Sequence, residues 1–447
     1  MAFDLLKLGD DTVSRALKLG ASAAESFLVS DRELSIEVAN QEVETMKVAE
    51  SAGLGMRVFK DGRMGFAYTA DLSKTGLDFV AAQAMENAKR SAVDEHNVLP
   101  EPVGNYTSLD LFDPEIDKTP VETKISLAKE IERQARQYDK RVTITERCAY
   151  QDSTYRVAIV NSHGISEEYK GAYCGAYSFL VAEENDEQQT GFGMQYRLKY
   201  NQLNPKEVGH EGAEKAVRML GAKEISTQRA TVVLDPYVAT NFLGVIAPAL
   251  SAESVQKGKS LFAGKVGQAV GARLLTIIDD GAMKGGVISA PMDGEGVPAG
   301  KTVLIDKGDL QGFLHNTYTA AKDGVASTGN GTRGSFKGTP EIGTTNFYIA
   351  PGETPRDKLL AEIDKGLYIT EVMGMHTANP ISGDFSVGAS GLWIENGKFT
   401  HPVRGVAIAG NVMDLLKSID CIGSDMTFFV GKGSPTVRIA RMTISGA

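Results

Sequence analysis

A glycine-rich stretch from Tyr368 to Met426 restricts the fold of this chain more than any other segment. Short apolar runs within it, such as Val403–Ala409, are interrupted by glycine, asparagine and aspartate at close intervals. This pattern is typical of antiparallel strands joined by tight turns. Asn396-Gly397 is the clearest turn, because both central residues of a type I′ hairpin need a positive φ angle. We therefore expect Leu392–Glu395 to pair with Lys398–Val403.

The chain has 447 residues, which is more than one hydrophobic core usually supports, so more than one domain is expected. We predict an α+β fold, with an N-terminal α+β domain over residues 1–222. The C-terminal domain, residues 223–447, is predicted to be mainly antiparallel and barrel-like, with a few helices. The order helix, strand meander, helix occurs twice, over about 1–92 and 119–222, and Ser153–Ala182 follows the pattern of Arg32–Phe59. An internal duplication and a chance likeness between two meanders both explain this repeat.

Prolines mark the starts of three helices. Thr119-Pro120, Asn204-Pro205 and Asp235-Pro236 each place a residue that caps helices before a proline that fits the first helical turn. The helix from Tyr237 to about Ala247 is apolar on most faces, so we expect it to be buried. Val266–Ile278 is predicted to form strand structure.

Composition and charge argue against several kinds of binding partner and cellular location. The net charge of −10 disfavours binding to nucleic acid and to anionic lipid. Three widely spaced cysteines give no disulfide or zinc pattern and suit a reducing compartment. The N-terminus lacks the pattern of a signal peptide, and the longest apolar run, near Phe242–Leu250, is too short to span a bilayer. The sequence therefore predicts a cytoplasmic protein without a membrane segment.

Residues 329–334 match the dinucleotide fingerprint G-x-G-x-x-G. A true fingerprint follows a hydrophobic strand and opens a helix, and here Gly338-Thr339-Pro340 prevents an immediate helix. We therefore reject a nucleotide site. Two interpretations remain open: a solvated loop, and a flexible loop whose Asn330 and Arg333 bind a peptide backbone or carboxylate.

Other candidate groups are scattered. No two of the six histidines lie within one helical turn, and neither H-E-x-x-H nor G-x-S-x-G occurs. His376, Asp384 and Ser386 are therefore kept only as candidate substrate-binding residues. The carboxylates of Asp279-Asp280 and of Asp293-Gly294-Glu295 are interpreted as solvated turns, with acid–base chemistry or cation binding as the alternative.

Several spaced motifs resemble one protein family, TldD/PmbA, whose members were once labelled modulators of DNA gyrase. The resemblance covers nearly the whole chain. The motifs that carry it are Ser260–Gly267, Asp279–Gly281, Asp293–Gly296, Thr328–Gly331, Ile381–Ser386 and Trp393–Gly397. The pair Gly-Asp-Phe-Ser and Glu-Asn-Gly is more similar to the PmbA (TldE) branch than to the TldD branch.

The resemblance also shows where this chain differs from TldD-like subunits. TldD-like subunits carry a helix with H-E-x-x-x-H, which binds a catalytic metal, and a cysteine near the C-terminus. The corresponding helix positions here are Leu243, Gly244 and Pro248. The acidic position that follows corresponds to about Ser251, and Gly431–Pro435 contains no cysteine. None of the three helix residues can bind a metal or accept a proton.

The family likeness therefore implies a metal-free subunit of a two-subunit peptidase acting on unfolded peptides. We expect no catalytic residue and no cofactor in this chain, with the metal, zinc by expectation, held by a TldD-like partner. This chain would form chamber walls and bind peptide by strand addition. The alternative is a self-sufficient peptidase or hydrolase acting as a homodimer. A gyrase- or DNA-binding module is suggested only by the old family label and opposed by the charge.

Overall fold

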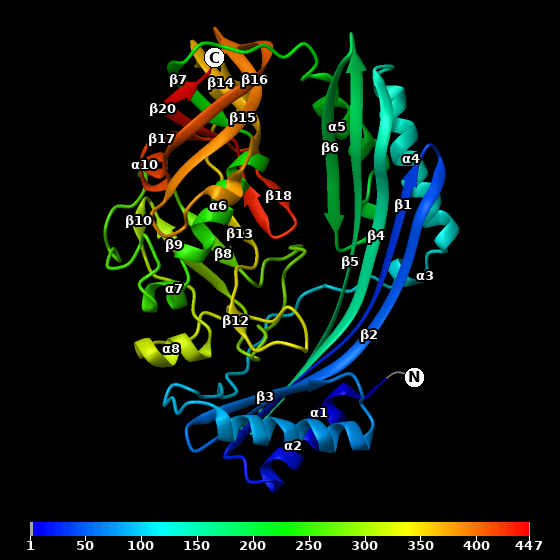
Figure 1. Cartoon of the computed structure of the whole chain (residues 1–447), viewed down its shortest axis with the longest axis vertical. Helices are drawn as coiled ribbons and strands as arrows, with labels where there is room; N and C mark the ends of the chain where they lie inside the picture. Colours follow the sequence, from blue (N-terminus) through cyan, green and yellow to red (C-terminus); the bar gives the residue numbers. More distant parts are fainter. Residues whose placement is uncertain (1–2, 447) are drawn as a thin grey trace.

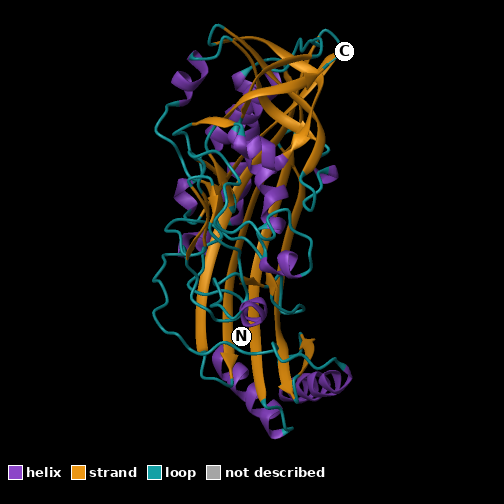
Figure 2. Cartoon of the chain, turned by 90° about the vertical axis from the view of Figure 1, so that its left-hand side faces the viewer, coloured by secondary structure: helices purple, strands orange, loops and turns teal. Residues whose placement is uncertain are grey.

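The computed structural model describes residues 3–446 and has a mixed α+β architecture, with 25% helix and 41% strand. Figure 1 shows a long, curved sheet from the N-terminal half that faces a C-terminal half built of shorter strands. The side view in Figure 2 shows the long strands running through most of the height of the molecule. The predicted α+β class is confirmed, including a closed five-stranded barrel in the C-terminal region.

Six antiparallel strands form the long sheet, in the order β3-β2-β1-β4-β5-β6. They are β1 (Ala23–Ala39), β2 (Glu42–Lys60), β3 (Arg63–Thr69), β4 (Val142–Asn161), β5 (Ser166–Glu184) and β6 (Glu187–Arg197). The four longest strands have 17 to 20 residues, which corresponds to about 60 Å of extended chain. Such length lets a single sheet carry two separate helical layers and one continuous opposite face.

The two faces of this sheet have different partners. Leu28 packs among residues of α1 (Leu5–Lys18) and α2 (Lys74–Arg90), and Leu34 packs among residues of α4 (Val121–Tyr138) and α5 (Pro205–Val217). Phe27 instead packs with Met292 and Phe336 of the C-terminal half. Because successive side chains of a strand point to opposite faces, this alternation covers one face with helices and turns the other toward the C-terminal half.

The long sheet consists of two three-stranded units, β1–β3 and β4–β6, whose elements follow the same order along the chain. Each unit has a helix, three antiparallel strands and a second helix, and β1 of the first unit pairs with β4 of the second. Gly65 and Gly191 occupy corresponding strands, and each lies directly beneath the backbone of the following helix. A Cβ atom would lie 2.0 Å from Ala84 O at the first position and 2.2 Å from Gly212 O at the second. This shared close contact is what an internal duplication would leave.

The C-terminal half contains two further six-stranded sheets and one short hairpin. The first sheet has the order β16-β15-β14-β7-β20-β17, and pairing of β16 with β20 closes five of its strands. Its strands are β7 (Gln228–Leu234), β14 (Lys365–Met373), β15 (Asp384–Glu395), β16 (Lys398–Asn411), β17 (Ile419–Ile422) and β20 (Val437–Ser445). The second sheet has the order β10-β9-β8-β13-β19-β18. Its strands are β8 (Ile277–Asp280), β9 (Lys301–Asp306), β10 (Asp309–Leu310), β13 (Phe347–Ile349), β18 (Thr427–Phe429) and β19 (Lys432–Ser434).

Short elements complete the chain. The hairpin consists of β11 (Gly331–Thr332) and β12 (Glu341–Ile342). The remaining helices are α3 (Pro114–Lys118), α6 (Pro236–Ala249), α7 (Ala252–Gln256), α8 (Thr317–Asp323), α9 (Arg356–Ala361) and α10 (Val412–Lys417), with 3₁₀ turns η1 (Tyr200–Gln202) and η2 (Met375–Thr377). Within residues 3–446, no helix combines the length and apolar character needed to cross a membrane.

The predicted hairpin around Asn396-Gly397 is confirmed. β15 and β16 pair in antiparallel fashion, with Glu395 opposite Lys398 and Gly391 opposite Val403. Asn396 and Gly397 have φ angles of 51° and 74°, as a type I′ turn requires.

The strand prediction for Val266–Ile278 was largely wrong. Only its last two residues belong to a strand, β8, while residues 266–276 form turns and irregular chain. Leu275 is nevertheless fully buried in the C-terminal core. The apolar residues of this segment therefore cover the core from a loop, which explains why their pattern resembled that of a strand.

Candidate functional site

Helix α6 is the central element of the candidate site. It follows β7 directly, and the side chain of Asp235 caps it by accepting a hydrogen bond from Tyr237 N at 3.0 Å. The hydroxyl of Tyr368 donates to the other oxygen of Asp235 at 2.8 Å, which anchors the helix start to β14. α6 packs against strands of both C-terminal sheets, so its position is set by the core.

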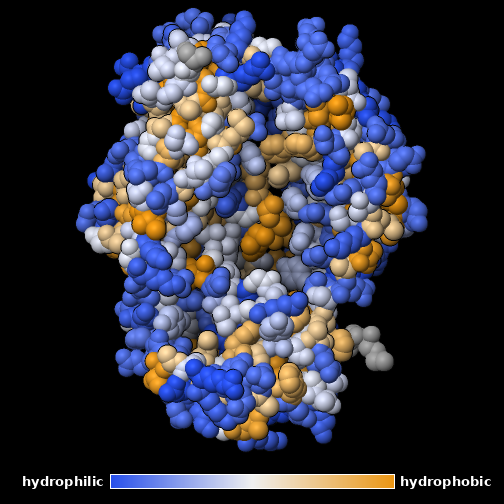
Figure 3. All heavy atoms as spheres, viewed as in Figure 1, coloured by the Kyte–Doolittle hydropathy of each residue, from blue (hydrophilic) through white to orange (hydrophobic). Residues whose placement is uncertain are grey.

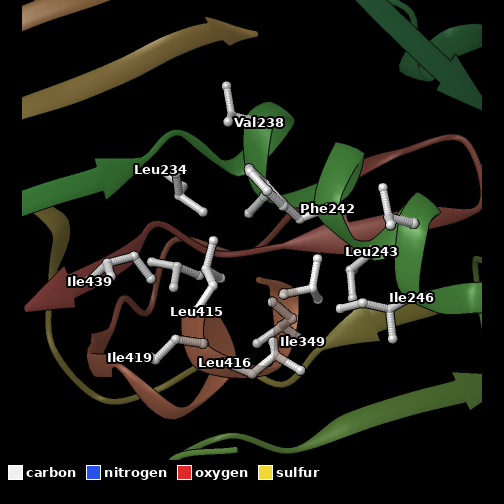
Figure 4. Packing of buried hydrophobic residues seen from close by; sticks show 14 of the residues in the cluster. Leu234, Val238, Phe242, Leu243, Ile246, Ile349, Leu415, Leu416, Ile419 and Ile439 are labelled. Carbon is white, nitrogen blue, oxygen red and sulfur yellow. The ribbon is translucent and has the colours of Figure 1, made fainter. Parts of the chain in front are cut away.

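The three positions that the sequence analysis relates to the metal-binding motif, Leu243, Gly244 and Pro248, lie on this helix. Leu243 is 1% exposed and points into the apolar cluster, beside Phe242 and Ile246 (Figure 4). Gly244 is half-buried and Pro248 is exposed. A metal site needs nitrogen, sulfur or oxygen donors on its side chains, and these three residues have none. The side chains at these three positions therefore do not fit a metal ion.

A positive charge lies beside this helix instead. The Nζ atom of Lys432, on β19, is 3.0 Å from the place where a Cβ atom of Gly244 would stand. Within residues 3–446, Lys432 has no carboxylate within 4.0 Å and no side-chain hydrogen bond. An ammonium group thus lies where a side chain at position 244 would extend.

An aromatic cavity of about 490 Å³ opens between α6 and the long sheet. In β5 and β6, Tyr177 lies opposite Met194 and Phe179 lies opposite Phe192, so all four side chains point to one face. The ring of Tyr237, in the first turn of α6, lies 4.7 Å from the ring of Phe192. Figure 3 shows the hollow between the two halves, with hydrophobic residues at its wall. The remaining lining residues are Glu146, Arg147, Ser178, Gly193 and Tyr196.

Two of the predicted substrate-binding residues are buried. Asn330 is 2% exposed, and its amide donates to Asp279 Oδ2 at 2.7 Å and to Gly343 O at 3.0 Å. The side chain of Arg333 is 0% exposed, forms an ion pair with Glu25, and donates to Gly294 O at 2.7 Å. The expectation of a flexible, accessible loop was wrong, because the polar groups of both residues are already satisfied within the protein.

The other three candidates are exposed on the closed sheet. Asp384 and Ser386 lie at the start of β15, and His376 lies in η2, which packs beside that strand. Hydrogen bonds from Asn411 and Ser382 lower the pKa of Asp384. Between Asp384 and Ser386, Phe385 packs against Phe242 of α6, with ring centroids 5.2 Å apart. The structure thus separates the five candidates into a buried pair and an exposed set of three.

Sequence reasoning missed a buried ionic cluster between the two halves of the chain. Arg57 donates to both carboxylate oxygens of Glu25, at 2.9 and 2.7 Å, and to Glu295 at 3.1 Å. Burial by itself would raise the pKa of Glu25, but Arg333 and Arg57 hold it below its ordinary value. Glu25 and Arg57 belong to the long sheet, whereas Glu295 and Arg333 belong to the C-terminal half. The cluster therefore joins the two halves.

The acidic turns are also buried rather than solvated. Asp279 is 1% exposed and Glu295 is 0% exposed. Asp293 accepts three backbone hydrogen bonds, from Glu295 N, Val297 N and Gly331 N, at 2.8 to 3.0 Å. Burial and the neighbouring carboxylate of Glu295 raise the pKa of Asp293 to about 7. Their glycine-rich surroundings indicated a turn, and only the long-range partners show that these turns are internal.

No cluster of three or more His, Cys, Asp or Glu side chains suited to holding a metal is found among the described residues. The surroundings of α6 instead offer aromatic rings in the cavity wall and a lysine beside Gly244. Groups of these kinds are suited to binding and orienting a ligand.

Comparison with known proteins assigns the chain to a family. Three models of PmbA/TldA metallopeptidases match it: domain 1 over residues 24–88, the central domain over 114–220 and the C-terminal domain over 227–446. Metalloprotease PmbA of Escherichia coli O157:H7 is 30% identical over 98% of this chain and 96% of its own length. A metalloprotease TldD homolog of Haemophilus influenzae is 29% identical over 88% of this chain and 86% of its own.

Solved structures of similar proteins support the same family assignment. A protein of Thermotoga maritima described as a modulator of a DNA gyrase superposes with a TM-score of 0.91 at 30% identity, covering 99% of this chain and 100% of its own. TldE from Thermococcus kodakarensis superposes with a TM-score of 0.91 at 25% identity, covering 98% of this chain and 99% of its own. Matches of this extent in sequence and in structure show that the chain belongs to the PmbA/TldD family of metalloprotease-like proteins.

Proposed function

We propose that this chain is the metal-free subunit of a two-subunit metallopeptidase that trims or degrades unfolded peptides. The observation that carries the proposal is the set Leu243, Gly244 and Pro248 on α6, which has no side-chain donor for a metal and no base for water. The catalytic metal then belongs to a TldD-like partner. The likeness to TldE from Thermococcus kodakarensis supports this assignment.

In this proposal the chain holds the substrate and forms part of the chamber wall. β18 is the outer strand of its sheet, and its residue Phe429 packs on Tyr237 of α6 with ring centroids 5.2 Å apart. An outer strand presents unpaired backbone groups, which an extended peptide can pair with regardless of its sequence. His376, Asp384 and Ser386 remain candidates for peptide contacts. Asn330 and Arg333 are withdrawn, because their side chains are buried.

The test is reconstitution with a TldD-like homologue that carries H-E-x-x-x-H. We expect the two chains to co-purify as a complex, with metal bound at one equivalent per complex and cleavage of an unfolded peptide. Changing the first histidine of the partner's motif to alanine should abolish both metal binding and cleavage. The same measurements on this chain alone should give neither.

Two results would refute the proposed function. Stoichiometric zinc and peptide turnover by this chain without a partner would refute the proposal and support the self-sufficient homodimer. Failure of the two chains to associate, with the partner fully active alone, would also refute it.

A further inference from the structure

We infer that the less buried side of α6 binds an extended peptide at two points: an aromatic or large apolar side chain in the aromatic cavity, and a carboxylate about three residues further on, at Lys432. This inference rests on the proposed function and adds a substrate preference to it.

The first point of contact is the cavity described above. Five of its lining side chains are aromatic, namely Tyr177, Phe179, Phe192, Tyr196 and Tyr237. Burial raises the pKa of Tyr177 and Tyr196, so both hydroxyls are neutral near pH 7. Its volume of about 490 Å³ is within the range of pockets that take small ligands. A wall of rings favours an aromatic or apolar side chain, since aromatic pairs add to the gain from burial.

The second point of contact lies along the same side of α6. Tyr237, Asn241, Gly244 and Pro248 recur at helical spacing, and all four are less buried than the residues that face the core. This less buried side of the helix therefore runs from Tyr237, in the wall of the aromatic cavity, to Gly244, beside which the ammonium of Lys432 lies. Asn241 stands between them, and no hydrogen bond of its amide is found within residues 3–446. Its amide can both donate to and accept from a peptide group.

The spacing of the two points selects an extended ligand. Tyr237 and Gly244 are seven residues apart, which is about 10 Å along a helix axis. An extended peptide advances about 3.3 Å per residue, so three residues span this distance. A free C-terminal carboxylate and an acidic side chain both match the charge of Lys432, and the two sources are separated by experiment.

The experiment measures binding of labelled hexapeptides to the purified full-length chain by fluorescence anisotropy. The parent peptide is Ser-Gly-Phe-Gly-Ser-Gly with a free C-terminus, and its relatives replace Phe by Ala, amidate the C-terminus, or amidate it and end in Glu. We expect the Phe peptide to bind at least about tenfold more tightly than the Ala peptide, because a buried ring contributes most of the apolar contact. Amidation should weaken binding by about threefold, as for a partly exposed ion pair. Restored affinity of the amide ending in Glu would show that a side-chain carboxylate serves equally well, and no restoration would assign the site to the C-terminus.

Variants locate the two contacts. Lys432→Gln should remove the difference between acid and amide and leave the preference for Phe. Phe192→Ala should remove the preference for Phe, and Met194→Glu, which retains every ring, should do the same. The matched controls are Lys398→Gln and Phe79→Ala, because both residues are exposed, and neither lines the cavity or belongs to α6. Neither control should change any ratio of affinities.

Equal binding of the Phe and Ala peptides, no binding of any peptide, or variant effects no larger than those of the controls would overturn the inference. These outcomes are distinct from failure of the proposed function. Cleavage by the reconstituted complex without any peptide preference would refute only the inference. A chain that selects the Phe peptide but carries its own zinc and hydrolyses peptide alone would refute only the proposed function.

Discussion

Replacing Arg57 by methionine tests how strongly the buried ionic cluster holds the two halves of the chain together. The side chain of Arg57 is 6% exposed, and those of its partners Glu25 and Glu295 are 0% and 1% exposed. Methionine keeps most of the apolar stem but removes three hydrogen bonds and the positive charge. Glu25 then keeps its ion pair with Arg333, whereas Glu295 loses its ion pair with Arg57.

The expected loss of stability is about 3–5 kcal/mol, because removing one partner leaves a buried charge uncompensated. This corresponds to a change of roughly two to four powers of ten in the unfolding equilibrium. The matched control is Lys257→Gln. Lys257 forms an ion pair with Glu253 at 2.7 Å, the same distance as Arg57–Glu25, but its side chain is 59% exposed. An exposed pair contributes about 0.2–1 kcal/mol, so the control shows what an exposed ion pair at the same distance contributes.

The assay is urea unfolding followed by two probes. Trp393 is the single tryptophan, and it is buried in the C-terminal core, so its fluorescence reports on that half. Far-ultraviolet circular dichroism is dominated by helices and long strands of the whole chain. We expect Arg57→Met to shift both transitions, since the cluster joins the halves. A loss below about 1 kcal/mol, or a loss equal to that of Lys257→Gln, would refute the reasoning from burial.

Three further predictions concern single positions. The raised pKa of Asp293, about 7 against 3.8 in the unfolded chain, means that the folded state binds this proton more tightly. The contribution of Asp293 to the free energy of unfolding therefore falls as pH rises from about 4 to 7, by up to about 1.4 kcal/mol per pH unit. Asp293→Ala should flatten this dependence of the unfolding free energy on pH, measured by unfolding titrations at several pH values. An unchanged dependence would contradict the prediction. Gly191→Ala should lower the free energy of unfolding by about 1–3 kcal/mol, because its Cβ would overlap the helix backbone. The control Gly338→Ala, with open space around the residue, should leave stability to thermal unfolding nearly unchanged. Equal effects of the two variants would exclude the close-contact explanation. Asn396→Val should cost about 1–2 kcal/mol, because a β-branched residue disfavours φ near 51°, and no change in the unfolding midpoint would count against the turn assignment.

Local chemistry determined much of what the sequence alone predicts. The hairpin at Asn396-Gly397 needs only two residues that tolerate positive φ. Proline placement likewise marked the start of α6 after Asp235, because a cap and a preset φ angle act within one turn. The lack of donor atoms at Leu243 and Gly244 is a property of the residue types themselves, and the fold does not alter it.

The tertiary structure decided which polar groups are accessible. Both interpretations of the loop at Arg333 placed this side chain in solvent or against a ligand, but its carboxylate partner Glu25 lies 308 residues away in the chain. Glu295 meets Arg57 across 238 residues. Periodicity and turn propensity report on neighbours within about one or two turns, so they carry no information about such pairs. The aromatic cavity arises in the same way, because rings from β5, β6 and α6 meet only when the long sheet and the C-terminal half are packed face to face.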